Sequence, residues 1–266
     1  MRVRDLAMGI NSRTNKTVRI GIVDTGISSI NYSMIGGNIL GGHNFSLDGT
    51  GRNYIKSETY HGFAVASIIL KVVPKAKLVI AKVLNDEGEG TPKRTAKGIR
   101  YCISKKCHII NCSIAGPHDP DLEDAVNEAY SKGIVIVGAT GNDGRDRLLY
   151  PASYLNCIGV GACDKDNKLT KFSNYNAFMD LIAFGDEVRI PTKEDVIIDR
   201  GTSFSAPLVT GELALLRQQF ELKNNRPPKC DEYSLIPKDE WENSDDYRKY
   251  FMNVKQNLLK SLDIKE

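Results

Sequence analysis

The sequence contains no apolar run of the roughly 18 residues needed to cross a bilayer. Residues 1–17 are polar and carry four basic side chains, so they lack the hydrophobic core of a secretory signal. Both absences argue against a membrane protein and against export. We therefore expect a cytoplasmic protein without a membrane partner, in which residues 1–17 form a short N-terminal arm.

A large excess of charge of either sign is also missing. The 266 residues include 36 Lys and Arg and 33 Asp and Glu, a formal net charge of +3, and no dense basic run occurs. Domains that bind nucleic acids usually carry a basic patch or stripe. We expect no nucleic-acid partner, and the charge balance leaves the oligomeric state open.

Disulfides are not expected, although the chain has six cysteines. Four of them lie in or beside apolar runs, which favours reduced thiols in the core. Cys102, Cys107, His108 and Cys112 are close in sequence, but they lack the tight Cys-x-x-Cys spacing of a zinc knuckle. We expect neither a metal site nor a cofactor.

Short apolar runs alternate with helical segments along most of the chain. Strands are expected at 18–24, 42–45, 78–84, 108–113, 134–138, 157–162, 179–183 and 196–198, and helices at 61–70, 95–104, 122–132 and 208–216. Strand–helix alternation implies right-handed crossovers and parallel pairing. We predict an α/β fold over residues 18–225, a three-layer open, mainly parallel sheet with helices on both faces.

The composition changes after residue 225. Residues 224–228 (Asn-Asn-Arg-Pro-Pro) break a helix, residues 231–246 are acidic, and residues 247–262 are amphipathic. We predict that 226–266 form a C-terminal extension that packs on the domain and ends in a helix. Whether it covers the flank of the sheet or recognises a leader peptide stays open.

Four polar residues fall where strands end or helices begin. Asp24 ends the first strand, His61 precedes an apolar helix, Asn142 lies in a glycine-rich turn after 134–138, and Ser203 lies in a Gly-Thr-Ser turn. Catalytic groups of open α/β sheets gather at the carboxyl ends of strands. Each residue alone also fits a structural role, as a turn residue, a helix cap or a packed side chain.

Taken together, these positions resemble the signature blocks of the subtilisin-like serine proteases, the subtilases. The blocks are Asp24-Thr25-Gly26, His61-Gly62, Gly141-Asn142-Asp143-Gly144 and residues 201–207 (Gly-Thr-Ser-Phe-Ser-Ala-Pro), in the order Asp, His, Ser. The resemblance extends from about residue 18 to residue 220. It implies that Ser203 attacks the scissile carbonyl, His61 moves the proton and Asp24 orients the imidazole. It also implies that Asn142 donates to the oxyanion, together with the Ser203 N–H.

The resemblance further implies a peptide or protein substrate that binds as an added β-strand. Matching residues are Ser113, Ile114, Ala115 and Gly116 on one wall of the cleft, Gly88 and Gly90 on the other, and Ala139, Thr140, Gly141 and Leu149 at the P1 pocket. Asp86, Glu87 and Glu89 suit a basic substrate segment, and equally a solvated loop. The link 67–73 has no carboxylate, so we do not expect the calcium loop of secreted subtilases there.

We therefore expect a small intracellular serine endopeptidase without a pro-domain that works through an acyl-enzyme. Intracellular subtilases that resemble it include proteases that process leader or precursor peptides, and housekeeping proteases. Two other functions stay open. One is a catalytically silent binding or scaffold protein on the same fold, and the other is a transpeptidase that uses the same acyl-enzyme.

Overall fold

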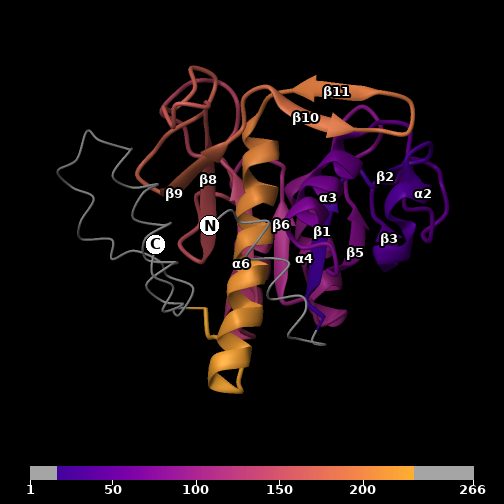
Figure 1. Ribbon diagram of the computed structural model, residues 1–266, viewed down its shortest axis with the longest axis horizontal. Coiled ribbons are helices and arrows are strands. Elements are labelled where there is room, and N and C mark those ends of the chain that lie inside the picture. Colours follow the sequence, from indigo (N-terminus) through magenta and orange to yellow (C-terminus); the bar gives the residue numbers. More distant parts are fainter. Residues whose placement is uncertain (1–16, 231–266) are drawn as a thin grey trace.

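The centre of the molecule is a seven-stranded sheet with the order β3-β5-β1-β6-β7-β8-β9, in a computed structural model that describes residues 17–230 (Figure 1). The strands are β1 (Arg19–Asp24), β3 (Ile39–Asn44), β5 (Lys77–Lys82), β6 (Ile109–Cys112), β7 (Val135–Ala139), β8 (Cys157–Cys163) and β9 (Met179–Phe184). Every neighbouring pair in this sheet is parallel. The predicted parallel sheet is confirmed.

Helices cover both faces of the sheet. The helices are α3 (His61–Val72) and α6 (Thr202–Asn224) on one face and α4 (Pro92–Ser104) and α5 (Pro120–Ser131) on the other, with a short α2 (Tyr32–Ile35) and 3₁₀ turn η1 (Gly36–Asn38) before β3. Each face has its own large cluster of buried apolar side chains. The three-layer α/β architecture is therefore confirmed.

Local sequence explains why these elements form. β1 and β7 are runs of β-branched and small residues that are buried almost throughout, as expected for strands covered on both faces. α4 begins at Thr91, whose side chain accepts the Arg94 N–H at 3.3 Å, and α5 begins at Asp119, which accepts the N–H of Asp121 at 2.9 Å. Both helices have proline at their first position, where its missing N–H costs nothing.

The strand expected at 196–198 forms outside the main sheet. β11 (Val196–Asp199) pairs antiparallel with β10 (Val188–Pro191), and Thr192 N–H donates to the Asp195 carbonyl at 2.7 Å in the turn between them. β10 was missed by the sequence analysis. A run of four residues is too short for its alternation to stand out as a strand signal. β2 (Ile27–Ser28) and β4 (Lys56–Ser57) form another small pair.

Helix α6 ends at Asn224, at the predicted break. Asn225 adopts a left-handed conformation (φ 53°), and two prolines follow. Residues 1–16 and 231–266 lie outside the described residues, and with them most of the predicted arm, most of the C-terminal extension and its predicted helix at 247–262. None of the described helices has the length and apolar character of a membrane span. The six cysteines are free thiols, and five of them are buried.

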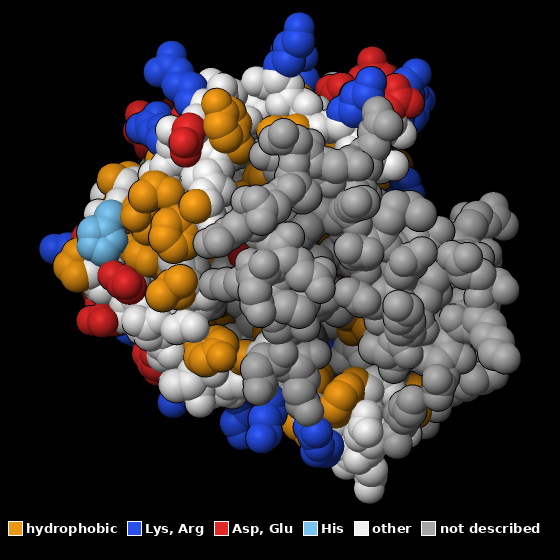
Figure 2. All heavy atoms as spheres, turned by 90° about the vertical axis from the view of Figure 1, so that its left-hand side faces the viewer, with side chains coloured by type: hydrophobic (Ala, Val, Ile, Leu, Met, Phe, Trp, Pro, Cys, Tyr) orange, Lys and Arg blue, Asp and Glu red, His pale blue; other side chains and the backbone are white. Residues whose placement is uncertain are grey.

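Exposed apolar side chains occur in the loops that flank β8 and β9. Leu148, Leu155, Tyr175 and Phe178 are between 39% and 72% exposed. Figure 2 views the molecule from this side and shows hydrophobic side chains gathered on part of the face, with Lys and Arg toward its margins. Folded proteins commonly expose apolar residues, so we assign this surface no role.

Candidate active site

Three neighbouring strands deliver polar residues to one edge of the sheet. β1 ends at Asp24, β6 is followed directly by Ser113, and Asn142 comes three residues after β7. These strands are adjacent and parallel, so their carboxyl ends lie side by side. This is the edge at which open α/β sheets bind ligands. The contacts below show that α3 and α6 also begin here, with His61 and Ser203 in their first turns.

Asp24 and His61 form a hydrogen-bonded pair. His61 Nδ1 lies 2.8 Å from Asp24 Oδ1; the carboxylate is fully buried, whereas the imidazole side chain is 28% exposed. Thr25 N–H donates to the same oxygen at 2.7 Å. An ionised carboxylate can only accept, so the shared proton belongs to Nδ1. In the neutral imidazole, Nε2 then keeps a lone pair and can act as a base.

The pKa of His61 lies above its ordinary value. Burial alone would lower it, but the charge of Asp24, the hydrogen bond to Asp24 and the charge of Asp199 together outweigh burial. A raised pKa makes the imidazole a stronger base for taking a proton from an alcohol. Only the neutral form can take that proton, so base catalysis weakens as the pH falls through this raised pKa.

Gly62 allows α3 to approach β1 closely. A Cβ atom at this position would lie 2.0 Å from the Gly26 carbonyl oxygen and 3.2 Å from Asp24 Oδ1. Gly62 N–H also donates to Thr25 Oγ1 at 3.1 Å. The glycine after His61 is therefore a packing requirement, because a side chain there would push the helix away from Asp24.

Ser203 is joined to Ser113 by two reciprocal hydrogen bonds. Ser203 Oγ donates to the Ser113 carbonyl at 3.0 Å, and Ser113 Oγ donates to the Ser203 carbonyl at 2.8 Å. Pro207 lies one helical turn after Ser203 and has no N–H, so the Ser203 carbonyl lacks its usual helical donor. Ser113 supplies the missing donor. The start of α6 is thereby fixed to the end of β6.

The imidazole and the hydroxyl share one site but are not hydrogen-bonded to each other. The ring of His61 lies 5.8 Å, centroid to centroid, from that of Phe204, the residue after Ser203. Within residues 17–230 the Ser203 hydroxyl donates to Ser113 and not to His61. Catalytic hydrogen bonds are often poorly aligned until substrate binds, and rotation about the Ser203 Cα–Cβ bond redirects the hydroxyl.

Asn142 lies against the turn that leads to Ser203. Its Oδ1 accepts hydrogen bonds from Thr202 N–H at 2.9 Å and Thr202 Oγ at 3.0 Å. Two donors on Oδ1 fix the orientation of the amide, and Nδ2 donates to no group in the described part of the chain. A Cβ atom at Gly201 would come within 3.2 Å of Nδ2. The amide is thus held beside Ser203 with an unused donor.

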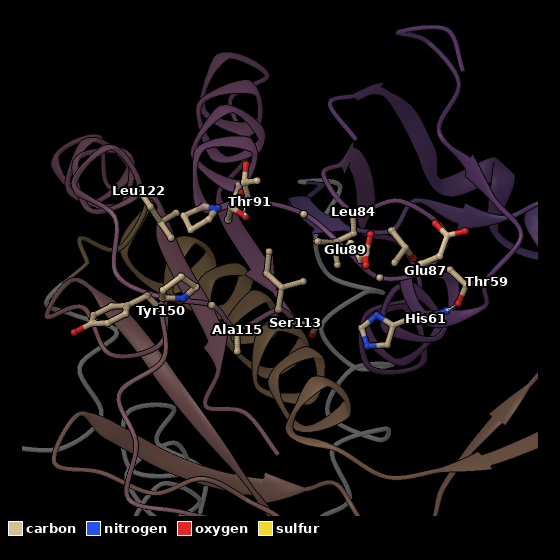
Figure 3. A pocket seen from close by; sticks show the side chains of 18 of the residues that line it. Thr59, His61, Leu84, Glu87, Glu89, Thr91, Ser113, Ala115, Leu122 and Tyr150 are labelled. Atoms are coloured by element: carbon tan, nitrogen blue, oxygen red, sulfur yellow. Dashed lines mark hydrogen bonds between the residues drawn. The ribbon is translucent and has the colours of Figure 1, made fainter. Parts of the chain in front are cut away.

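A groove of about 860 Å³ begins at His61. Figure 3 shows His61 at one end and Tyr150 at the other, with Ser113 and Ala115 between them. The walls contain all six cleft residues expected from the sequence, namely Ser113, Ile114, Ala115, Gly116, Gly88 and Gly90. Asp86, Glu87 and Glu89 also line the groove, and no Lys or Arg of the described residues does. The backbone groups of Ala115 and Gly90, on opposite walls, form no hydrogen bond among residues 17–230.

Clusters of His, Cys, Asp and Glu side chains that could hold a metal ion are absent from the described residues. A hydrogen bond with Cys107, together with burial, raises the pKa of the Cys102 thiol, and burial raises that of Cys112. Thiols held in the protonated form are poor metal ligands.

A profile of the subtilase family (Peptidase_S8) matches residues 15–231 of the chain. The chain belongs to the subtilase family. It is 35% identical over 225 residues to the major intracellular serine protease of Bacillus subtilis (strain 168), covering 77% of this chain and 70% of that protein. It is 33% identical over 210 residues to subtilisin BL of Lederbergia lenta, covering 77% and 78%. This protein is a subtilisin-like serine endopeptidase.

Solved structures of two other proteases share the subtilase fold. The prenylagaramide maturation protease PagA superposes with a TM-score of 0.74 at 25% identity, covering 95% of this chain and 98% of that one. A lanthipeptide protease superposes with a TM-score of 0.75 at 17% identity, covering 90% and 87%. At that lower identity the second likeness shows the fold alone.

The four residues expected around the P1 side chain of a subtilase lie outside the lining of the groove. Ala139 and Thr140 are each 1% exposed, and Thr140 Oγ lies within hydrogen-bond distance of the Val160 and Asn174 carbonyls, so both side chains face the interior. Leu149 packs on Gly141, where a Cβ atom would lie 2.6 Å from Leu149 Cδ1. The structure brings these residues together, and their role at P1 stays a prediction.

Two buried residues that sequence reasoning missed connect β6 to α6 beneath the subtilase site. Asn111, inside β6, donates to Ser113 Oγ at 2.9 Å and accepts from Thr210 of α6 at 2.8 Å. An asparagine within a buried strand needs hydrogen-bond partners, which is a signal that the sequence did contain. Only the fold identifies Thr210 as its partner, 99 positions away.

Lys82 is a third missed residue. It ends β5 and is fully buried, and its Nζ lies 2.9 Å from Asp86 Oδ1, 3.0 Å from the Thr25 carbonyl and 3.3 Å from Asp48 Oδ2. Burial would raise the pKa of Asp86, but hydrogen bonds from Ser57 and Lys82 and the charge of Lys82 hold it below its ordinary value. The Lys82 ammonium group therefore connects Asp86, in a wall of the groove, with Thr25, which follows β1.

Proposed function

We propose that this subtilase cleaves peptide bonds with Ser203 as nucleophile, His61 as general base and Asp24 as the group that orients the base. The observation that carries the proposal is the 2.8 Å contact between Asp24 and His61 at the sheet edge where α6 begins, with Ser203 in its first turn. The relatives named above are serine proteases, which supports the same assignment.

The reaction proceeds in two stages. His61 Nε2 takes the proton of Ser203 Oγ while that oxygen bonds to the peptide carbonyl carbon; the proton then passes to the leaving amine as the C–N bond breaks, which leaves an ester on Ser203. The same imidazole next deprotonates a water that attacks the ester, and the hydroxyl is restored as the acid departs. Asp24 stays ionised throughout and stabilises the imidazolium.

Replacing Asn142 with alanine is expected to lower kcat by about 10²–10³-fold with little change in KM. We propose that its unused Nδ2 donates to the oxyanion, which exists in the transition state and not in the bound substrate. Steady-state kinetics on a chromogenic peptide measure the effect. Asn127→Ala, at an exposed position of α5, is the matched control and should keep its kcat within about twofold. Equal kcat values in the two variants would contradict the oxyanion role.

The substrate binds as an added strand between the walls of the groove. Ala115 and Gly90 both line that space, and their unpaired backbone groups can pair with an extended peptide. Asp86 is already paired with Lys82, so Glu87 and Glu89 supply the remaining negative charge of the groove. Basic side chains near the cleaved bond fit this charge.

The biological role that we propose is maturation of a precursor peptide in the cytoplasm. PagA, a protease named for peptide maturation, aligns over almost the whole of this chain. The name of one relative, the major intracellular serine protease of Bacillus subtilis, supports a cytoplasmic location. A protease surrounded by cellular proteins needs narrow specificity, and a groove with a defined charge can provide it.

Digestion of a proteome-derived peptide library, read by mass spectrometry, tests this role. The wild-type enzyme should cut a narrow set of sites with Lys or Arg near the cleaved bond, and the Ser203→Ala variant should cut none. Broad cleavage without flanking preference would contradict a dedicated substrate. Joined products would indicate a transpeptidase. A folded protein that neither cuts nor reacts with a fluorophosphonate would be a binding protein.

A further inference from the structure

The residue before His61 is hydrogen-bonded to the strand that precedes Ser203. Tyr60 Oη donates a short hydrogen bond to Asp199 Oδ2, across 139 positions of the chain. Tyr60 is the N-cap residue of α3, and Asp199 ends β11, four residues before Ser203. This hydrogen bond therefore connects the segment that carries the base with the segment that leads to the nucleophile.

The segment before Ser203 is also anchored elsewhere, since Gly201 N–H donates to the Gly185 carbonyl at 2.8 Å and Ser203 pairs with Ser113, but neither contact reaches α3. Neither N-cap residue, Tyr60 for α3 or Gly201 for α6, caps its helix with a side-chain hydrogen bond. The β10–β11 hairpin is not part of the main sheet, so the hydrogen bonds of that sheet do not hold it in place. Figure 1 shows the hairpin lying across the region where α3 and α6 begin. Within residues 17–230, the bond between Tyr60 and Asp199 is the hydrogen bond that joins these two segments directly, and the His61 ring packs beside that of Phe204.

The Asp199 carboxylate is oriented by both of its oxygens. Oδ1 accepts the Arg200 N–H at 2.7 Å, in the turn that leads to Gly201, while Oδ2 accepts from Tyr60. Burial, the hydrogen bond to Asp199 and the charge of Asp199 raise the pKa of Tyr60 to about 12. The phenol therefore keeps its proton, and its role as donor, across the pH range in which a histidine base works.

We propose that Tyr60 and Asp199 are a positioning pair, whose hydrogen bond aligns His61 with Ser203. The proposal rests on the Asp24–His61–Ser203 assignment made above. The negative charge of Asp199 also helps to raise the pKa of His61, because Asp199 is one of the carboxylates around the imidazole. Asp24 of β1 is the direct partner, Asp199 approaches from β11, the acidic loop 86–89 lies across the groove, and α6 presents the uncharged ring of Phe204.

The Tyr60→Phe variant tests the alignment, because it removes only the hydroxyl. We expect kcat to fall about tenfold with KM unchanged within twofold, as for the loss of a hydrogen bond to a charged group. Tyr54→Phe is the matched control, since Tyr54 is 40% exposed and lies outside the site, and its kcat should equal that of the wild type. Rates are normalised to the concentration of enzyme that a fluorophosphonate labels.

The Asp199→Asn variant separates charge from hydrogen bonding. Asparagine keeps an oxygen acceptor for Tyr60, so kcat above neutral pH should stay within about threefold of the wild type. Removing a negative charge that raises the pKa of His61 should move the acid limb of kcat/KM to lower pH. Asp195→Asn, at an exposed position of the same hairpin, should leave the limb in place.

The outcomes separate this proposal from the proposed function. Activity that survives in Ser203→Ala refutes the triad assignment itself, whatever the Tyr60 variant does. If the triad holds, a Tyr60→Phe enzyme as fast as Tyr54→Phe, or an unmoved acid limb in Asp199→Asn, overturns the positioning pair. A Tyr60→Phe/Asp199→Ala double variant no slower than Tyr60→Phe supports a pair that acts as a unit, because alanine removes the acceptor, and independent losses overturn it.

Discussion

Replacing Ser203 with alanine is expected to lower kcat by about 10⁶-fold, the size of the loss known for the nucleophile of subtilisin, another member of this family. The reason is chemical: without Oγ no ester can form, and His61 has no alcohol to deprotonate. Hydrolysis would then depend on the groove and on the Asn142 donor, which give only a residual acceleration over water. Single-turnover and steady-state kinetics on one peptide substrate measure the loss.

Ser205→Ala is the matched control for this prediction. Ser205 is two residues further along α6, and its buried hydroxyl donates to the Ala183 carbonyl at 2.9 Å, on β9 rather than at the groove. Its kcat should stay within a few-fold of the wild type, and a fluorophosphonate should label Ser205→Ala but not Ser203→Ala. A loss below about 100-fold in folded Ser203→Ala would rule out Ser203 as the nucleophile.

Replacing Lys82 with methionine is expected to lower the free energy of unfolding by about 3 kcal/mol. Removing the buried ammonium takes an ionic partner from the Asp48 and Asp86 side chains, which are 15% and 37% exposed, and a hydrogen-bond donor from the Thr25 carbonyl. Methionine has a similar length and no branch, so little packing is lost. Urea unfolding in the Ser203→Ala background measures the change without self-digestion.

Lys77→Met, on the same strand, is the control for that measurement. Lys77 donates from an exposed position to the Gly37 carbonyl at 2.8 Å, so its loss should cost well under 1 kcal/mol. Adding Asp86→Asn to Lys82→Met should restore part of the lost stability, because it removes one unpaired charge. Equal unfolding midpoints for Lys82→Met and Lys77→Met would show that the buried ammonium adds no stability.

Most of the main sheet was predictable because its strands carry their own signal. The runs at β1, β5, β7 and β8 are apolar on both faces, and helices α4 and α5 begin at recognisable caps. β10 was missed because its alternating run is only four residues long. The sequence also did not show that β11 pairs with β10 outside the main sheet. The local sequence pattern determines whether a segment forms a β-strand, whereas the strand with which it pairs depends on the fold.

The residues of the candidate site also fall into those that the sequence identifies and those that only the fold identifies. Asp24, His61, Asn142 and Ser203 were identifiable because glycine-bounded motifs at strand ends and helix starts mark them. Lys82, Asn111, Tyr60 and Asp199 were not, because each acts through a partner distant in sequence or outside any motif. The P1 residues were carried over from a resemblance, and the structure turns two of those side chains inward.

The sequence by itself determined the strand–helix order, the residues with the right chemistry and the family blocks that contain them. The tertiary structure alone decided that Asp24 touches His61, that Ser113 replaces the donor missing at Pro207, and that Tyr60 reaches Asp199. The physical reason is that hydrogen bonding acts over about 3 Å, while these partners are tens of residues apart in the chain. Only packing of the helices on the parallel sheet sets those distances.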